Sequence, residues 1–190
     1  LSSLFCIFMN VVHKLFRKYF KNQYVRVFAG GVMLVLLNII LNTTDYNGTG
    51  MNIIAQALNR EAKPTAFLLK ALFTAITIGC GFRGGEIVPS FFVGATFGCA
   101  MGGLMGLDPG FAAALGMVCF FCGVVNCPLT SLFLSIELFG AHGILLFTIG
   151  CAVSYMLSGY YSLYNEQKII YSKLRPHYVN LYTNQEIKTK

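Results

Sequence analysis

Apolar residues along the chain gather in short runs, and each run is bounded by Gly, Pro or Asn. The main runs predict helices at residues 27–41, 66–82, 90–107, 111–125, 129–139 and 143–158. A shorter amphipathic piece, Met51–Leu58, lies inside the polar stretch 42–65. No run reaches the ~20 clean apolar residues of a simple spanning helix. The pattern therefore predicts many short helices, some of them crossing only part of a bilayer.

Four prolines stand close to the expected helix starts: Pro64, Pro89, Pro109 and Pro128. Proline suits the first turn of a helix, where its missing N–H has no partner to lose. Interrupted apolar helices are tolerated in a bilayer only where neighbours or a polar cavity satisfy their backbone groups. Transporters build their ion sites from such discontinuous helices. The interruption of the apolar runs by proline therefore favours a transport protein over a simple membrane anchor.

Composition narrows the class of protein. Of the 190 residues, 56% are hydrophobic and 11% are charged, whereas a soluble domain carries ~25% charged residues. The mean hydropathy is +0.65. This composition excludes a soluble enzyme and a disordered segment, and no solvated groove is available for nucleic acid despite a pI near 9.1. We expect an all-α polytopic membrane protein with lipid around it and no nucleic-acid partner.

Most of the basic residues flank the apolar body. They are Lys14, Arg17, Lys18, Lys21 and Arg26 at one end, and Lys168, Lys173, Arg175, Lys188 and Lys190 at the other. Lys and Arg gather in cytoplasmic segments, so we expect both ends of the chain in the cytoplasm. The expected organisation has three parts. Residues 1–26 hold the end of a preceding helix and a basic linker, 27–165 the membrane domain, and 166–190 a basic cytoplasmic tail.

Seven cysteines lie in or beside apolar runs. Cys119, Cys122 and Cys127 have the spacing of a metal knuckle, but no His or carboxylate lies close to them. We interpret all seven as small apolar residues packed in the membrane, and expect neither a metal nor another cofactor.

Gly94, Gly98, Gly102 and Gly106 recur every four residues and place a glycine stripe on one face of the helix at 90–107. Such stripes allow the backbones of two membrane helices to approach closely. Helix packing is the favoured interpretation of the stripe, and a pore lining is the alternative.

Charged residues inside the apolar body are candidates for function. The sequence offers Arg83, Glu86, Glu137 and Lys70. Arg83 and Glu86 are three residues apart, so a local ion pair is expected. We interpret Lys70 as a lysine that snorkels toward the interface and Glu137 as a structural, hydrogen-bonded residue.

The segment from Gly81 to Gly94 (GFRGGEIVPSFFVG) is the most informative part of the chain. Gly84 and Gly85 permit a sharp turn, and Pro89 then begins a helix in the apolar interior. A helix N-terminus carries unpaired N–H groups and about half a positive charge. It can bind an anion without a full cation, weakly enough for the anion to leave again.

This segment resembles the anion-binding motif of the CLC chloride channels and transporters, in the run Gly85 to Gly94 (GEIVPSFFVG). The motif has the form seen in bacterial members of the family, which implies a bacterial cell membrane. Three other stretches resemble the family in order and spacing: Asp45 to Gly50, Gly123 to Glu137, and Gly159 to Tyr164. The resemblance covers nearly the whole chain. It implies one of two inverted repeats of the CLC fold, with many short tilted and re-entrant helices.

The resemblance also implies site residues. The backbone N–H groups of Ile87 and Val88 would face the anion, within the motif framed by Gly85 and Pro89. Ile87 stands where many members have Phe. Tyr164 would donate its hydroxyl to the anion. Tyr161 is the alternative, because this chain has one residue more before its Leu-Tyr pair than some members. Glu86 does not match the gating glutamate, which belongs to a related motif of the other half.

We therefore expect the C-terminal half of a voltage-gated-type chloride channel or H⁺/Cl⁻ exchange transporter. Chloride, or a similar anion, is the transported ligand, with protons as a possible second one, and a homodimer is implied. The first residue is Leu1, not Met, so we expect the N-terminal half to be missing, and no transport from this half alone. The alternatives are a fluoride-type or other anion transporter of the same fold, and a cation-coupled symporter with broken helices.

Two rivals belong to other classes. An intramembrane enzyme requires paired acids or a His cluster at depth, and the sequence shows neither. A non-transporting scaffold accounts for the glycine stripe but gives no purpose to the Gly84–Pro89 junction.

Overall fold

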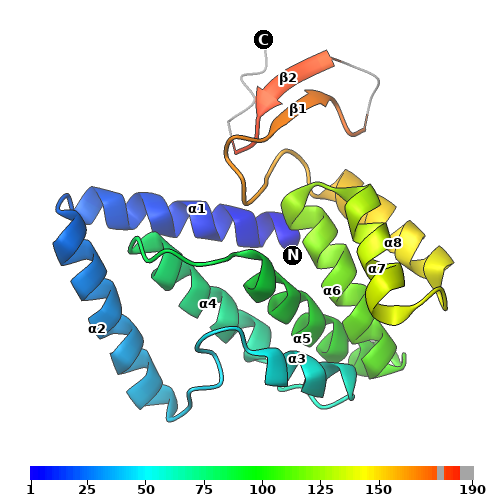
Figure 1. Cartoon of the computed structure of the whole chain (residues 1–190), viewed down its shortest axis with the longest axis horizontal. Coiled ribbons are helices and arrows are strands. Elements are labelled where there is room, and N and C mark those ends of the chain that lie inside the picture. The colour runs from blue at the N-terminus through cyan, green and yellow to red at the C-terminus, as the bar shows by residue number, and fades with distance from the viewer. Residues whose placement is uncertain (175–177, 185–190) are drawn as a thin grey trace. The chain divides into compact units, whose positions relative to one another are not determined.

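The computed structural model describes residues 1–174 and 178–184 (Figure 1). Arg175, Lys188 and Lys190 of the basic tail lie outside the described residues. The helices are α1 (Ser2–Tyr19), α2 (Gln23–Leu41), α3 (Met51–Leu58), α4 (Ala66–Gly79), α5 (Ile87–Met105), α6 (Pro109–Val125), α7 (Pro128–Phe139) and α8 (Ile144–Leu157). Two strands follow, β1 (Lys168–Tyr171) and β2 (Tyr178–Tyr182). All predicted helices are confirmed, and the helical fold class is confirmed with them.

Two elements extend the sequence picture. Helix α1 occupies most of the stretch expected to hold a helix end and a basic linker, and the two strands form an antiparallel hairpin within the expected tail. Lys168 pairs with Tyr182 and Tyr171 with Tyr178, with an irregularity between Ile169 and Tyr171.

Length and composition allow two of the described helices, α2 and α5, to cross a membrane, with 19 residues each. Helices α4, α6, α7 and α8 are apolar but shorter. The expectation of short apolar helices therefore holds for these four helices. Helix α2 has 19 residues where the pattern at 27–41 predicted 15, and α5 has 19 where the pattern at 90–107 predicted 18.

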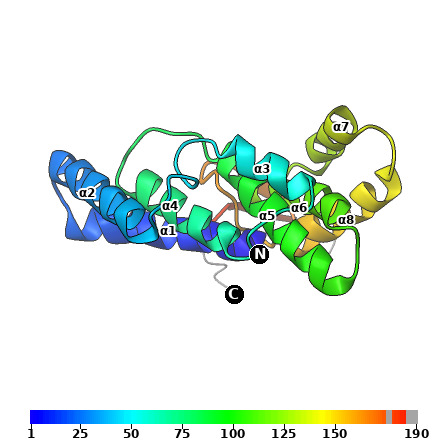
Figure 2. The same ribbon diagram turned by 90° about the horizontal axis from the view of Figure 1, so that it is seen from below.

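The chain divides into two compact units: residues 8–117, and residues 1–7 together with 118–190. In the first unit, α5 packs against both α3 and α4, and α2 packs against α4 (Figures 1 and 2). Aromatic rings fill the space between them. Tyr46, from the loop before α3, contacts Phe73 of α4 and Phe92 of α5, with ring centroids 5.9 and 6.3 Å apart.

Glycines bring α5 and α6 into backbone contact within this unit. A methyl group on Gly98 would collide with the carbonyl oxygen of Ala112, and one on Gly102 with the Ala112 side chain. From the other side, a methyl group on Gly116 would lie 2.5 Å from the Gly94 oxygen. The packing interpretation of the glycine stripe is confirmed at these positions. Gly103, beside the stripe, has no atom within 4 Å of the same point.

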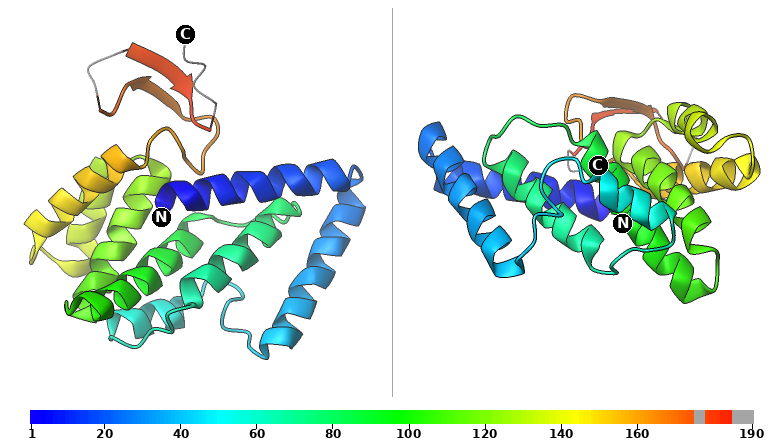
Figure 3. Two further views of the ribbon diagram at one scale, coloured as in Figure 1. Left: turned by 180° about the vertical axis from the view of Figure 1, so that it is seen from behind. Right: turned by 60° about the horizontal axis from the view of Figure 1, so that its bottom comes forward.

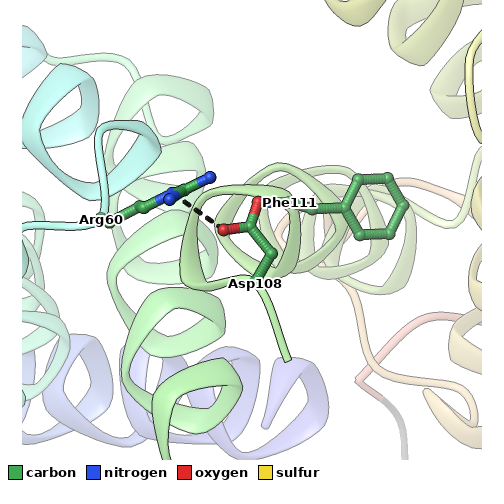
Figure 4. Close-up of polar contacts among 3 residues, drawn as sticks. All are labelled: Arg60, Asp108 and Phe111. Atoms are coloured by element: carbon green, nitrogen blue, oxygen red, sulfur yellow. Dashed lines mark hydrogen bonds and ion pairs between the residues drawn. The ribbon is translucent and has the colours of Figure 1, made fainter. Parts of the chain in front are cut away.

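An ion pair links the residues after α3 to the start of α6 (Figure 4). Arg60 Nε lies 2.8 Å from Asp108 Oδ1. The other carboxylate oxygen of Asp108 accepts the N–H of Phe111 at 3.2 Å, while the Phe111 ring points away from the pair. Asp108 therefore caps α6, whose first residue is Pro109, and holds the preceding turn to α3.

In the second unit, α7 packs against α8, and the hairpin follows α8 in the chain (Figure 3). Phe139 and Phe147 stack with centroids 5.8 Å apart and an angle of 2° between the rings. Phe5, at the start of α1, meets Phe120 of α6 edge to face at 5.4 Å. Most side chains on the outer faces of α7 and α8 are exposed and apolar, as expected for helices that face lipid or another protein chain.

Candidate anion-binding site

The junction between α4 and α5 is the centre of the candidate site. After α4 the chain passes Gly84 and Gly85, which have no neighbour within 4 Å where a Cβ would stand. Helix α5 then begins at Ile87, three residues earlier than the pattern predicted, so Pro89 is its third residue rather than its start. Proline is accepted there because the first four N–H groups of a helix have no intrahelical partner. The shift places Ile87 and Val88 in the first helical turn.

The first turn of α5 keeps two free donors. In the described part of the chain, the N–H groups of Ile87 and Val88 donate to no protein acceptor, and the Glu86 side chain does not cap the helix. Ser90 is the first residue whose N–H bonds back, to the Glu86 oxygen at 3.1 Å. The Ser90 hydroxyl turns inward and donates to the Ile87 oxygen at 2.6 Å. The two N–H groups together with the helix dipole make this end locally positive.

Lys70 of α4 adds a full positive charge near this turn. Its side chain is 2% exposed. Its ammonium donates to the carbonyl oxygens of Tyr46 at 3.0 Å and Gly48 at 2.7 Å, and lies 5.0 Å from the centroid of the Phe92 ring. The interpretation of Lys70 as a snorkelling lysine is therefore wrong: the loop before α3 comes to the lysine and supplies acceptors in the interior.

A cavity of about 460 Å³ joins these groups within the unit formed by residues 8–117. Its walls include Lys70, Gly85, Val88 and Pro89, and the loop segment Tyr46–Thr49. Ile87 is not among the lining residues, and its side chain is 38% exposed. Helix start, buried ammonium and polar loop thus surround one space whose electrostatics suit an anion.

The other charges of this region behave differently from expectation. The ion pairs among the described residues are Arg60 with Asp108 and Lys63 with Asp45, so the ion pair expected between Arg83 and Glu86 is not formed. Arg83 is exposed. With its own charge unpaired, Lys70 remains the uncompensated cation of the cavity wall.

Tyr164 and its alternative Tyr161 belong to the other compact unit, residues 1–7 and 118–190, and not to the unit that holds the α5 start. Both side chains are partly exposed, at 43% and 41%. The backbone of Tyr164 is held firmly: its N–H donates to the Ser162 hydroxyl at 3.2 Å, and its carbonyl accepts the hydroxyl of Thr183, the residue after β2. Among residues 1–174 and 178–184, the Tyr164 hydroxyl has no hydrogen-bond partner.

Sequence reasoning named Lys70 but missed its place in the site. The signal was the loop resemblance at Asp45 to Gly50, whose carbonyl groups the lysine binds. Every residue has a backbone carbonyl group, so the amino-acid types in the loop do not show which of them accepts a hydrogen bond from Lys70. The sequence therefore indicated the lysine but not its acceptors.

Short apolar helices around a cavity, one of them with an unpaired start, are typical of membrane proteins built from discontinuous helices. Residues 1–159 match the sequence profile of the family described as voltage gated chloride channel, and the chain belongs to this CLC family of multi-pass membrane proteins.

Individual relatives agree with this family. The chain is 34% identical, over 176 residues, to the chloride/fluoride channel protein of Pseudomonas syringae pathovar tomato, covering 88% of this chain and 39% of that protein. It is 24% identical to the H(+)/Cl(−) exchange transporter ClcA of Vibrio cholerae, over 86% of this chain and 38% of the relative. The fold matches the crystal structure of a CLC-type fluoride/proton antiporter with a TM-score of 0.83 and 31% identity, over 86% of this chain and 42% of the other. The chain thus spans about two fifths of the length of these proteins.

Proposed function

We propose that this chain supplies the anion-binding helix start of a CLC anion channel or proton-coupled anion transporter. The observation that carries the proposal is the pair of free N–H groups at Ile87 and Val88, at the start of a helix beside a cavity walled by buried Lys70. Backbone donors and a helix dipole can replace part of the hydration shell of an anion while allowing its release. The hydroxyl of Tyr164 is proposed as a further donor to the same anion.

Chloride and fluoride are the two anions that the relatives' names suggest. Fluoride is the second candidate because the first relative named and the matched structure both include it in their descriptions. Protons are proposed as the coupled ion in an exchanger, where a channel would need none. The protein is proposed to act as a homodimer in lipid, with both chain ends in the cytoplasm, as the basic flanks indicate.

The test is ion efflux from liposomes that contain the whole protein carrying this chain. Chloride-loaded and fluoride-loaded vesicles are followed with ion-selective electrodes, and pH is recorded outside. We expect efflux of at least one anion, with proton uptake if the protein is an exchanger. Efflux that requires Na⁺, with no anion movement in its absence, would instead support the cation-coupled symporter.

A further inference from the structure

Lys173, in the segment after β1, lies against the ends of two helices. Its ammonium donates to Oδ1 of Asn126 and to the hydroxyl of Ser158, the latter at 2.7 Å. It also lies 4.4 Å from the centroid of the Tyr155 ring. Asn126 directly follows α6, and Ser158 is the residue that ends α8. A residue of the tail is therefore bound at the point where two helix C-termini meet.

The charge of Lys173 is balanced by helix ends rather than by a carboxylate. Neither ion pair found among the described residues involves it. A helix C-terminus carries about half a negative charge, so two of them suit an ammonium group. The titratable groups that face it are Tyr155 of α8, Cys122 of α6 and Cys6 of α1.

The lysine and the Ser158 hydroxyl together fix which way the Asn126 amide points, because both donate to its Oδ1 atom, the hydroxyl at 3.1 Å. An ammonium group has three donors and no acceptor, so the amide must present its oxygen to Lys173. The amide nitrogen then faces the opposite way and donates to the Tyr161 oxygen at 2.9 Å. Asn126 itself has φ +59°, a left-handed conformation that asparagine tolerates better than most residues.

From Tyr161 onward the chain is bonded to the last carbonyl groups of α6. The N–H of Leu163 and the hydroxyl of Ser162 both donate to the Val124 oxygen, at 3.0 and 3.1 Å. The Gln167 amide donates to the Val125 oxygen at 3.1 Å. The same Ser162 hydroxyl accepts the N–H of Tyr164. The segment that carries Tyr164 is thus hydrogen-bonded to the C-terminal end of α6, next to Asn126, which Lys173 contacts.

We propose that Lys173 is a positioning residue for Tyr164, acting through the Asn126 amide and the segment 161–167. The proposal rests on the proposed function in one respect only, that the Tyr164 hydroxyl faces the anion. The positioning itself concerns contacts within residues 118–184 and can be measured without any anion.

Hydrogen exchange tests the positioning directly. In Lys173→Met of the whole protein, the Asn126 oxygen loses its charged donor and keeps only the Ser158 hydroxyl, so the amide is held less firmly. The N–H groups of Leu163 and Tyr164 should then exchange about fivefold faster, the factor for one net hydrogen bond. Lys173→Arg keeps the donors and should restore slow exchange. Lys168→Met is the matched control, because Lys168 also lies over a tyrosine ring, that of Tyr182 at 4.9 Å, but is exposed on the hairpin. Unchanged exchange in Lys173→Met overturns the proposal.

A double-mutant cycle tests the consequence for the anion. Lys173→Met and Tyr164→Phe should each weaken anion affinity. The double variant should bind the anion no more weakly than Tyr164→Phe alone, because both substitutions remove the same interaction, that of the Tyr164 hydroxyl with the anion. Additive losses would overturn the link to Tyr164. Absence of anion binding in the unmodified protein would refute the proposed function, while the exchange experiment would still decide the positioning.

The extent of the faster exchange distinguishes this role from a general structural one. Lys173→Met removes a donor from two buried groups, Asn126 and Ser158, so some loss of melting temperature is expected, but the faster exchange should stay within residues 161–167. A lower melting temperature, with faster exchange spread over all of residues 118–184, would show a general structural role and overturn the proposal.

Discussion

At the scale of single residues, Lys70 combines two tasks. Its ammonium satisfies two loop carbonyl groups and places a positive charge in the wall of the cavity. An amine that reached the interface would do neither. The contacts therefore predict that its replacement affects both the fold and the anion.

Lys70→Met should destabilise the protein by about 1–3 kcal/mol for each carbonyl group left without a donor. It should also weaken anion affinity by roughly tenfold, from the loss of about 1–2 kcal/mol of Coulomb attraction at an effective dielectric constant near 20. Thermal unfolding and calorimetric titration measure the two effects.

The control for that change is Lys63→Met. Lys63 is a loop lysine of the same unit, and its side chain is 71% exposed. Its Nζ atom lies 3.8 Å from Oδ2 of Asp45. An exposed pair of this kind contributes about 0–1 kcal/mol, so both measurements should change little. Equal effects of the two substitutions would contradict the role given to Lys70.

Glu86 is predicted not to gate the pathway. It precedes α5 in the chain, caps no N–H group with its side chain, and stands three residues before Pro89. Glu86→Gln keeps its size and removes its charge. Anion flux should keep the same dependence on pH and voltage, as measured in liposomes at several proton gradients. A flux that no longer responds to pH would show Glu86 to be the gate.

Prediction from single residues succeeded for proline and glycine, whose backbone preferences restrict where they occur. Pro89 and the paired glycines indicated a helix start at this junction, although the helix begins at Ile87, two residues before the proline. It failed for Lys70 and for the pair Arg83 and Glu86, because spacing alone does not reveal whether a nearer acceptor exists. The backbone oxygens of Tyr46 and Gly48 lie more than twenty residues from Lys70 in sequence.

At the scale of elements, the contact between α5 and α6 depends on the absence of side chains. Gly98→Leu should prevent the two backbones from meeting and abolish stable folding, since overpacking costs about 1–3 kcal/mol even where neighbours can move. Here the neighbour is a carbonyl oxygen of Ala112. The measurement is the monodisperse yield after extraction in detergent.

Gly103→Leu is the matched control for the same helix. It lies one residue beyond Gly102, is exposed, and has nothing within 4 Å of the added carbon. We expect the yield of this variant to equal that of the unmodified protein. If both leucine variants fold equally well, the close approach of α5 and α6 is not required.

The capping of α6 predicts a smaller effect. Asp108→Ala removes the acceptor for the Phe111 N–H and should cost about 1 kcal/mol. Arg60→Ala removes only a solvent-exposed partner of the same carboxylate and should cost less. Denaturation of the two variants side by side checks the order, and a larger loss for Arg60→Ala would contradict the capping role.

Elements were predicted from the sequence where apolar runs are continuous. Helix α1 was recognised only in part because Lys14, Arg17 and Lys18 suggested a linker. Yet Phe5, Met9 and Phe16 are all buried and lie at helical spacing, which continues through the basic residues. The hairpin was missed because its strands are four and five residues long and sit in a charged tail. The alternation in Tyr178–Tyr182 was the available signal.

At the scale of the whole molecule, charge and burial predict a pH effect in the tail. Burial lowers the pKa of Lys173 to about 8, below its ordinary value of 10.5. Below pH 8 the lysine is charged in both the folded and unfolded states, and the folded state bears the cost of desolvation. Between about pH 8 and 10.5 the unfolded state binds more protons, so stability should rise with pH.

The measurement is thermal unfolding of the protein and of Lys173→Met across this range. The difference between the two melting temperatures isolates the lysine, because every other group titrates in both proteins. We expect the unmodified protein to gain on the variant as pH rises from 8 to 10.5. A constant difference would show that Lys173 has its ordinary pKa when folded.

Lys70 has a further consequence for how the protein is made. A lysine in an apolar helix resists insertion by the translocon, at an apparent cost of up to about 3 kcal/mol at the helix centre, and Lys70 is the fifth of the 14 residues of α4. The two carbonyl groups that bind its ammonium, from Tyr46 and Gly48, belong to chain that leaves the ribosome before α4 does. Helix α4 can therefore enter the bilayer together with the preceding loop as one unit. The order of synthesis supplies the partners of this lysine before the lysine needs them.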